Sequence, residues 1–123
     1  MAKIIPNLIM IRSVNVDVSL AFYQTLGLAF AEEQHGKGPV HHACEIDGFV
    51  FEIYPAESGN APVYTDGGAT MLGFQVDVLD DVLAELESIG IHPKTPPKES
   101  PWGRWCMVFD PDGRAVNLSE ESS

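Results

Sequence analysis

Positive charge is scarce in this sequence. Seven lysines and arginines stand against 18 aspartates and glutamates, which gives a formal net charge of −11. Proteins that bind nucleic acid neutralise phosphates with basic side chains, so this balance excludes nucleic acid as an expected partner. The surplus of negative charge would attract a cationic ligand at long range, but we favour solubility as its explanation, because the charge of a whole chain says little about one site.

Long apolar runs and paired cysteines are also missing. No stretch approaches the length of a membrane span, and residues 1–6 lack the apolar core and cleavage site of a signal peptide. We therefore expect a cytoplasmic protein with no membrane partner. Cys44 and Cys106 are the two cysteines and have no metal-like or redox-like spacing. Free, packed thiols in a reducing compartment are the expectation.

The familiar short catalytic motifs are absent as well. The sequence contains no phosphate-binding loop, zinc finger or nucleophile elbow. What it contains instead is an internal repeat. Asp47-Gly48 and Asp112-Gly113 are each followed by a strand-like segment, and Glu52 and Asn117 stand at the same distance after the two turns. The segments 20–27 and 82–90, upstream of these turns, also correspond. Two copies of one unit indicate a symmetric fold with a shared cavity.

The first copy reads as a strand, a helix and three strands. Asn15 is placed to cap the helix, whose apolar stripe of Val18, Phe22 and Leu26 ends at Gly27. The strands are expected at residues 8–11, 28–34, 39–46 and 49–54, with the last two joined by the Asp47-Gly48 hairpin turn.

The second copy repeats this order after a connector rich in proline and glycine. Asp80 or Asp81 is expected to cap its helix, which ends at Gly90. The strands are expected at residues 71–78, near Ile91, at 102–109 and at 114–119, with an Asp-Pro-Asp-Gly turn before the last. The predicted class is α+β, a single domain over 1–123 with module one at about 5–55, a linker at 56–68 and module two at about 69–120.

The repeated unit, with Ser19-Leu20-Ala21-Phe22-Tyr23 opening the first helix and Asp110-Pro111-Asp112-Gly113 before the last strand, resembles the vicinal oxygen chelate superfamily. That superfamily includes glyoxalase I, bleomycin resistance proteins, fosfomycin resistance enzymes and extradiol dioxygenases. The resemblance covers nearly the whole chain. It implies two βαβββ modules whose curled mixed sheets form a ligand cup, and it implies a homodimer.

The resemblance also implies four positions for a divalent metal ion in the metal-dependent members. Glu52 matches the position on the closing strand of module one, and Asn117 stands where glyoxalases have a second glutamate. The opening strands place Leu8 and Phe74 there, or Asn7 and Gln75 if the alignment shifts by one. Leu and Phe have no lone pairs to replace the water of an ion. No cofactor is therefore expected, with a divalent metal kept as the alternative.

Glu52 is the most informative single residue. Strand alternation places Val50, Glu52 and Tyr54 on one face and Phe49, Phe51 and Ile53 on the other. The Phe and Ile face is expected to meet the helix, which leaves Glu52 and Tyr54 in the cup. A carboxylate there is a candidate general base or an anchor for a ligand. The alternative is a glutamate hydrogen-bonded for structural reasons.

His41 and His42 are adjacent on a strand and therefore point to opposite faces. One of them enters the cup, where it is a candidate acid or base near Glu52 or a ligand of a metal at an atypical site. The sequence does not say which. A packed, hydrogen-bonded histidine is the alternative for either residue.

Two tryptophans and an arginine follow Ser100-Pro101. Counted by alternation, Trp102 and Arg104 share a face and Trp105 takes the other. Tryptophan walls bind flat ligands by stacking, and arginine holds carboxylates through two hydrogen bonds. The alternative is a core tryptophan and an arginine paired with acids of the surface.

Two functions from different classes follow. The first is a binding protein that sequesters a drug-like small molecule in its cup, with Tyr54, Trp102, Arg104, Trp105 and Asn117 as ligand-binding candidates. The second is a glyoxalase-like lyase, isomerase or dioxygenase, with Glu52, His41 and His42 as catalytic candidates. A scaffold with an inert cup is a third reading. We favour the binding protein.

Overall fold

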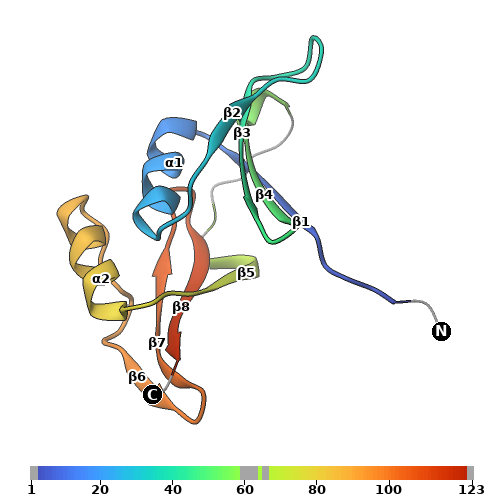
Figure 1. The fold of residues 1–123 in the computed structure, drawn as a ribbon. Coiled ribbons are helices and arrows are strands. Elements are labelled where there is room, and N and C mark those ends of the chain that lie inside the picture. The colour runs from blue at the N-terminus through green and yellow to red at the C-terminus, as the bar shows by residue number, and fades with distance from the viewer. Residues whose placement is uncertain (1–2, 59–63, 65–66, 122–123) are drawn as a thin grey trace.

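The computed structural model describes residues 3–58, 64 and 67–121, which form two four-stranded mixed sheets and two helices (Figure 1). The first module consists of β1 (Leu8–Ser13), α1 (Val16–Thr25), β2 (Ala31–Glu33), β3 (His41–Ile46) and β4 (Phe49–Pro55), followed by one short 3-10 turn, η1 (Ala56–Ser58). The second consists of β5 (Gly67–Gln75), α2 (Leu79–Ser88), β6 (Lys98–Ser100), β7 (Gly103–Phe109) and β8 (Arg114–Glu121). The predicted α+β class with two βαβββ modules is confirmed.

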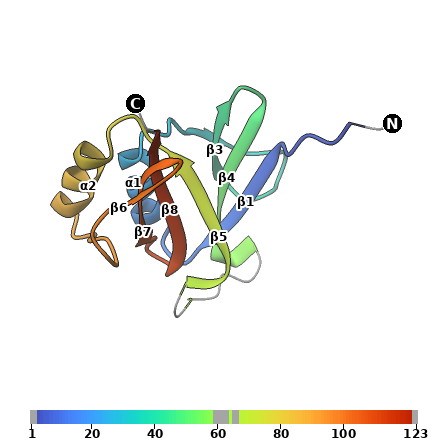
Figure 2. The same ribbon diagram turned by 90° about the horizontal axis from the view of Figure 1, so that it is seen from below.

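The two sheets have the same topology. Their strand orders are β1-β4-β3-β2 and β5-β8-β7-β6. The pairs β1–β4 and β5–β8 are parallel, and the other neighbouring strands are antiparallel. The sheets do not close into a barrel. Both helices lie on the same side of the sheets, and the opposite faces are left uncovered by helix (Figure 2).

The core lies between the helices and the sheets. Strand alternation sends Phe51 and Ile53 of β4 and Val116 and Leu118 of β8 towards the helices, where all four are buried. Tyr23 of α1 joins the two halves, because its ring packs edge-on against Phe51 and Phe74. Both cysteines are free and buried, as predicted. Burial raises the pKa of the Cys106 thiol.

The local signals at turns and helix ends act as expected. The Asn15 side chain accepts a hydrogen bond from the backbone N–H of Val18 at the start of α1. Gly27 and Gly90 follow the two helices with φ angles of 110° and 83°, in the left-handed region that glycine adopts without strain. Asp47 and Gly48 have φ angles of 50° and 86°, which are typical of the tight hairpin turn that Asp-Gly favours.

Three expectations about the second module were wrong. Val78 is the N-cap of α2 and gives no side-chain cap, so Asp80 and Asp81 lie within the first turn. The Glu120 carboxylate of β8 accepts the hydrogen bond of the Leu79 N–H instead. Ile91 lies in irregular chain, where the prolines that follow disfavour a strand, and the short edge strand is β6. β5 ends at Gln75 rather than at Val78.

The Asp-Pro-Asp-Gly turn before β8 ties the modules together. Asp110 accepts a hydrogen bond of 2.6 Å from the Tyr23 hydroxyl and an ion-paired hydrogen bond of 3.0 Å from Arg114. Asp112 accepts from the backbone N–H of Val14, and Arg114 donates to the carbonyl of Arg12. These side chains are buried, so the network joins both modules where water is excluded. Neither helix within the described residues has the length and apolar character needed to cross a bilayer.

Candidate functional site

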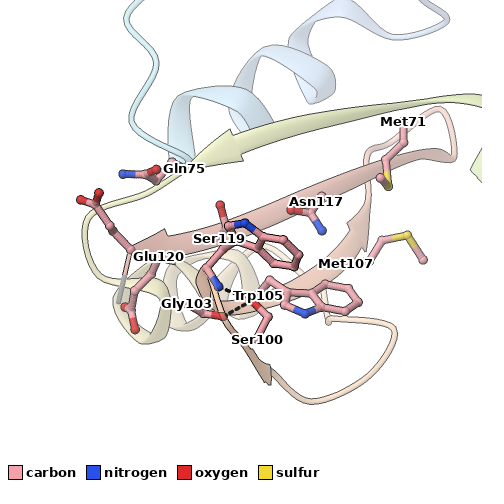
Figure 3. Close-up of a pocket in the computed structure, with 11 residues that line it drawn as sticks. Met71, Gln75, Ser100, Gly103, Trp105, Met107, Asn117, Ser119 and Glu120 are labelled. Carbon is pink, nitrogen blue, oxygen red and sulfur yellow. Dashed lines mark hydrogen bonds between the residues drawn. The ribbon is translucent and has the colours of Figure 1, made fainter. Parts of the chain in front are cut away.

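The second sheet carries a pocket of about 620 Å³ on the face turned away from the helices. That volume suits a drug-sized ligand. The pocket is formed by side chains of β5, β7 and β8 and by the turn between β6 and β7 (Figure 3). The lining residues are Met71, Gln75, Ser100, Trp102, Gly103, Trp105, Met107, Asn117, Ser119, Glu120 and Glu121.

Strand alternation and register explain why these side chains meet. Trp105 and Met107 alternate with the buried Cys106 and Val108 along β7, so both point away from the core. Met107 lies opposite Asn117 in the register with β8, and Asn117 lies opposite Gly73 in the register with β5. Figure 3 shows Trp105, Met107, Met71 and Asn117 at the same face of the sheet.

Gly73 lies opposite Asn117 in the register of β5 with β8, although it is not itself part of the pocket lining. Strand alternation puts residue 73 on the face of Met71 and Gln75, which do line the pocket. A Cβ built at Gly73 would have nothing within 4 Å, and its φ is not in the left-handed region, so a side chain could be added there. An amide carries both donors and an acceptor, so Asn117 can fix the orientation of a ligand that the apolar walls hold.

Trp102 does not follow the alternation of β7, because it belongs to the preceding turn. Its backbone N–H donates to the Ser100 hydroxyl, which in turn donates to the carbonyl of Gly103. This turn directs the indole ring to the mouth of the pocket, where 83% of its surface is exposed. Both tryptophans of the chain therefore line one cavity, although the sequence placed them on opposite faces.

Arg104 lies outside the pocket lining and does not share a face with Trp102. Its guanidinium is paired with carboxylates of Asp80, Glu99 and Glu120 at 3.2–3.7 Å. The hydrogen bonds and charge of Asp80, with smaller contributions from Glu120 and Glu99, raise the pKa of the guanidinium. The positive charge of Arg104 is therefore paired within the protein, as in the alternative of an arginine paired with acids of the surface.

The first sheet carries a second hollow of about 520 Å³ on its corresponding face. Glu52 lies in it, as strand alternation predicted, together with Glu33, Ala43 and Val50. The two hollows have no lining residue in common. Glu52 and Asn117, which occupy equivalent positions in the two copies, therefore lie in separate cavities of this chain.

His41 is the histidine that accompanies Glu52. Its Nε2 lies 3.5 Å from a Glu52 carboxylate oxygen and 3.3 Å from one of Glu33, and its ring stacks on Tyr54 with centroids 4.1 Å apart. The side chain is 1% exposed. Burial, followed by the charges of Glu52 and Glu33, raises the pKa of the neighbouring Tyr54 hydroxyl.

His42 points to the other face of β3. It pairs in register with Ile53, whose side chain lies in the core, while Ala43 pairs with Glu52. The Nδ1 atom of His42 is buried and has no hydrogen-bond partner among the described residues. Of the three catalytic candidates, the structure therefore brings Glu52 and His41 together and separates His42 from them.

The residues at the four metal positions implied by the resemblance to the vicinal oxygen chelate superfamily are poorly suited to bind an ion. Phe74 stacks on Phe51, with ring centroids 5.7 Å apart, and has no donor atom for an ion. The shifted alternative, Gln75, lines the pocket of the second sheet. Leu8 shares the sheet with Glu52 and offers no donor. Of the four positions, Glu52 supplies the one carboxylate and Asn117 an amide, and Asn7 or Gln75 adds an amide only if the alignment shifts by one. These groups are a weak ligand set for a divalent transition-metal ion.

Several site residues escaped prediction. Met71 and Met107 form apolar walls of the pocket, and the alternation along β7 could have identified Met107. The position of Gly73 beside Asn117 depends on the pairing of β5 with β8, which the sequence does not give. The contact of Glu33 with His41 depends in the same way on the register of the β2–β3 hairpin.

The sequence model described as the Glyoxalase/Bleomycin resistance protein/Dioxygenase superfamily matches residues 5–118. No curated protein matches the sequence at a significant level.

Solved structures resemble the fold along nearly its whole length. TnmS3, described as an antibiotic binding protein from Streptomyces sp. CB03234, has 25% sequence identity and a TM-score of 0.70, with 99% of each chain covered. A glyoxylase/bleomycin resistance protein/dioxygenase domain from Frankia sp. EAN1pec has 18% identity and a TM-score of 0.71, covering 100% of this chain and 95% of its own. A hypothetical protein from S. aureus, SA1046, has 16% identity and a TM-score of 0.72, covering 98% and 95%.

Proposed function

We propose a binding function for this chain, which belongs to the Glyoxalase/Bleomycin resistance protein/Dioxygenase superfamily. In this proposal the protein binds a small, flat, drug-like molecule in the pocket of its second sheet and carries out no chemistry on it. We call this cavity the tryptophan pocket, after Trp102 and Trp105 in its lining. The proposal concerns the ligand class and the binding mode, which membership in a superfamily of binders and enzymes leaves open.

The observation that carries the proposal is the composition of the tryptophan pocket. Two indole rings and two methionines surround about 620 Å³, and Asn117 provides an amide at the floor. Indole rings bind flat conjugated molecules by stacking, and methionine adapts to irregular shapes. A largely apolar cavity with few polar groups is typical of a small-molecule site.

The described lining residues include two carboxylates and no histidine, which supports binding rather than turnover. Glu120 accepts a hydrogen bond from the Leu79 N–H and pairs with Arg104, and Glu121 is exposed at the end of β8. Asn117 does not titrate, and Ser119 and Ser100 have no histidine among the other residues of the lining. The lining residues therefore favour binding of a ligand over proton transfer to or from that ligand.

The antibiotic binding protein TnmS3 is consistent with this ligand class, since it shares 25% of its residues with this chain over nearly the full length. The formal charge of −11 adds a preference for cations, because a low-dielectric pocket in an acidic protein attracts positive ligands. We therefore propose planar aromatic cations as the first ligands to test.

Thermal unfolding tests the proposal directly, because a ligand that binds the native state must stabilise it. At 100 times its Kd, such a ligand adds about 2.7 kcal/mol, which raises the melting temperature by several degrees. The probes are bleomycin and the planar cation proflavine, with the planar anion fluorescein as the charge control. Trp105→Ala should remove the shift, whereas Phe109→Ala, on the same face of β7 but outside the pocket lining, should retain it. No shift with either cation contradicts the proposed ligand class.

A glyoxalase-like enzyme remains the second candidate because of one observation. Glu52 and His41 are 3.5 Å apart in the hollow of the first sheet, which places a base beside a second proton carrier. Turnover of a keto-aldehyde such as methylglyoxal with glutathione, or of a catechol, would support it. Glu52→Gln should then abolish that turnover while leaving ligand binding in the tryptophan pocket intact. Full turnover in this variant would rule out Glu52 as the catalytic base.

A further inference from the structure

The hairpin that joins β2 to β3 carries metal-ligating side chains that the proposed function does not use. Glu33, His35 and His41 each offer one ligand atom, and the three atoms lie within 4.8 Å of one another. Glu33 and His41 are direct partners in the hairpin register, and His35 follows Glu33 by two residues. The local fold therefore brings two imidazoles and a carboxylate together, and we call these three residues the hairpin cluster.

The spacing of the cluster is close to that of an occupied site. His41 Nε2 lies 3.3 Å and His35 Nε2 lies 3.7 Å from the Glu33 oxygen. Ligands bound at about 2.0–2.2 Å in a tetrahedral zinc site are roughly 3.3–3.6 Å apart. The three ligand atoms lie within 4.8 Å of one another, so His35, whose side chain is 75% exposed, has to move closer to His41 to complete the geometry.

The buried ring of His41 is already oriented for an ion. Its Nδ1 lies 3.2 Å from the carbonyl of Pro39, an acceptor, so in the neutral ring this contact favours the tautomer with the hydrogen on Nδ1 and the lone pair on Nε2. Metal-bound histidines are held in this way through their other ring nitrogen. Stacking on Tyr54, with an interplanar angle of 8°, further restrains the ring.

The groups around Nε2 of His41 would be stabilised by a cation. Carboxylate oxygens of Glu33 and Glu52 lie 3.3 Å and 3.5 Å from it, and the Tyr54 hydroxyl lies at 3.4 Å. Two carboxylates facing one imidazole lone pair repel both it and each other, and a positive ion among them removes the repulsion. The Tyr54 hydroxyl is the neutral donor available when no ion is bound.

We propose that Glu33, His35 and His41 bind one divalent transition-metal ion of the zinc type, with Glu52 beside its fourth position. Two nitrogens and one carboxylate form the ligand set that zinc, cobalt, nickel and copper accept, whereas magnesium and calcium prefer oxygen alone. Three protein ligands leave one position for water or a ligand. The site differs from the four superfamily positions, because its ligands come from β2, β3 and the segment between them.

A structural ion pair is the competing explanation. In that case the contacts of His41 with Glu33 and Glu52 only hold the hairpin to the sheet, the hairpin needs no metal, and His35 is a surface residue. The two explanations differ in what zinc does to the protein. An ion pair gains nothing from zinc, whereas the hairpin cluster binds it at one ion per chain.

Calorimetric titration with Zn²⁺ tests the proposal on full-length protein prepared without a histidine tag and stripped with chelator. We expect one zinc ion per chain and no comparable binding of Mg²⁺. His35→Gln and Glu33→Gln should each weaken zinc binding by at least about tenfold, since even outer partners of metal ligands contribute 10–100-fold. The matched controls are His92→Gln and Glu32→Gln, which change exposed residues outside the cluster and should bind as the unchanged chain does.

Spectroscopy identifies the ligands independently of affinity. Co²⁺ added to the stripped protein should give the visible absorption of a tetrahedral nitrogen and oxygen site, and Zn²⁺ should shift the ring nitrogen resonances of His35 and His41 but not that of His92. Asn117→Ala separates the cluster from the superfamily positions and should leave zinc binding unchanged. The proposal is overturned if zinc does not bind, if His35→Gln binds as tightly as the unchanged chain, or if Asn117→Ala loses the ion.

Discussion

Tyr23 is the residue on which the junction of the two modules most depends. Its ring touches aromatic residues of both sheets, and its hydroxyl donates to Asp110. Burial, with the charge and hydrogen bond of Asp110, raises the pKa of this hydroxyl well above its ordinary value. Burial lowers the pKa of Arg114, but the hydrogen bond and charge of Asp110 outweigh it and leave that pKa raised.

Tyr23→Phe isolates the hydroxyl, since the aromatic packing is retained. Hydrogen bonds to charged groups contribute about 1.5–3 kcal/mol, so the free energy of unfolding should fall by about that amount. Urea denaturation at pH 7.5 measures the difference. An unchanged midpoint and slope would show that the Tyr23–Asp110 bond does not stabilise the fold.

The raised pKa of Tyr23 also predicts a pH dependence. The ordinary pKa of tyrosine is 10.0, and the folded protein holds this proton to higher pH than the unfolded chain does. The native state therefore binds more protons above about pH 10, and stability falls as pH rises. Below that pH the contribution is fully present. Urea titrations between pH 8 and 11 should show a decline that is shallower in Tyr23→Phe, and parallel declines would contradict the assignment.

Residue positions were predictable where a strand alternates regularly. Glu52, Trp105 and Asn117 face the uncovered sides of their sheets for that reason. Trp102 was misplaced because the strand begins one residue later, at Gly103, and the turn sets the direction of the indole. The choice of His41 over His42 required the pairing of β3 with β4, which alternation alone does not give.

At the scale of the element, the two helices begin in different ways. α1 has a local cap in Asn15, whereas α2 begins at Val78 without a side-chain cap and relies on Glu120 from the distant β8. Asn15→Ala should therefore destabilise the protein by about 1 kcal/mol, and Asn15→Ser, which keeps an acceptor, by much less. Thermal denaturation of the two variants measures the difference, and equal losses would show that the cap bond is not the cause.

The elements of the first module were predicted more accurately than those of the second. Asn15, Gly27 and Asp47-Gly48 are local signals that act within a few residues of themselves, and each is confirmed. The start of α2 and the placement of β6 depend on contacts with β8 and β7, which lie far along the sequence. Local chemistry was therefore sufficient for α1 and insufficient for α2.

At the scale of the whole molecule, the two hollows lie on separate sheets, and each is lined by its own module. The resemblance to the superfamily implies a homodimer, and this stays a prediction. Light scattering coupled to size-exclusion chromatography should give twice the 13.4 kDa of one chain. A mass of one chain at micromolar concentration would contradict it.

The net charge predicts how salt affects ligand binding. A surplus of 11 negative charges attracts cations over a distance that salt shortens, from about 30 Å at 0.01 M to about 8 Å at 0.15 M. The affinity for proflavine should therefore fall as salt rises, while that for a neutral planar ligand should not. Titrations at the two salt concentrations test this, and a salt-independent affinity for the cation would show that the field of the protein is not involved.

The central claim is that the tryptophan pocket binds a flat ligand, and Gly73→Val tests it most directly. Register and alternation place the new side chain beside Asn117, on the face of Met71 and Gln75, and its Cβ meets no atom within 4 Å, so the fold should persist. Both tryptophans of the chain line this pocket, and quenching of their fluorescence by proflavine reports occupancy. We predict saturable quenching that Gly73→Val weakens at least about tenfold, or about 1.4 kcal/mol. Quenching with equal affinity in both proteins would contradict the account.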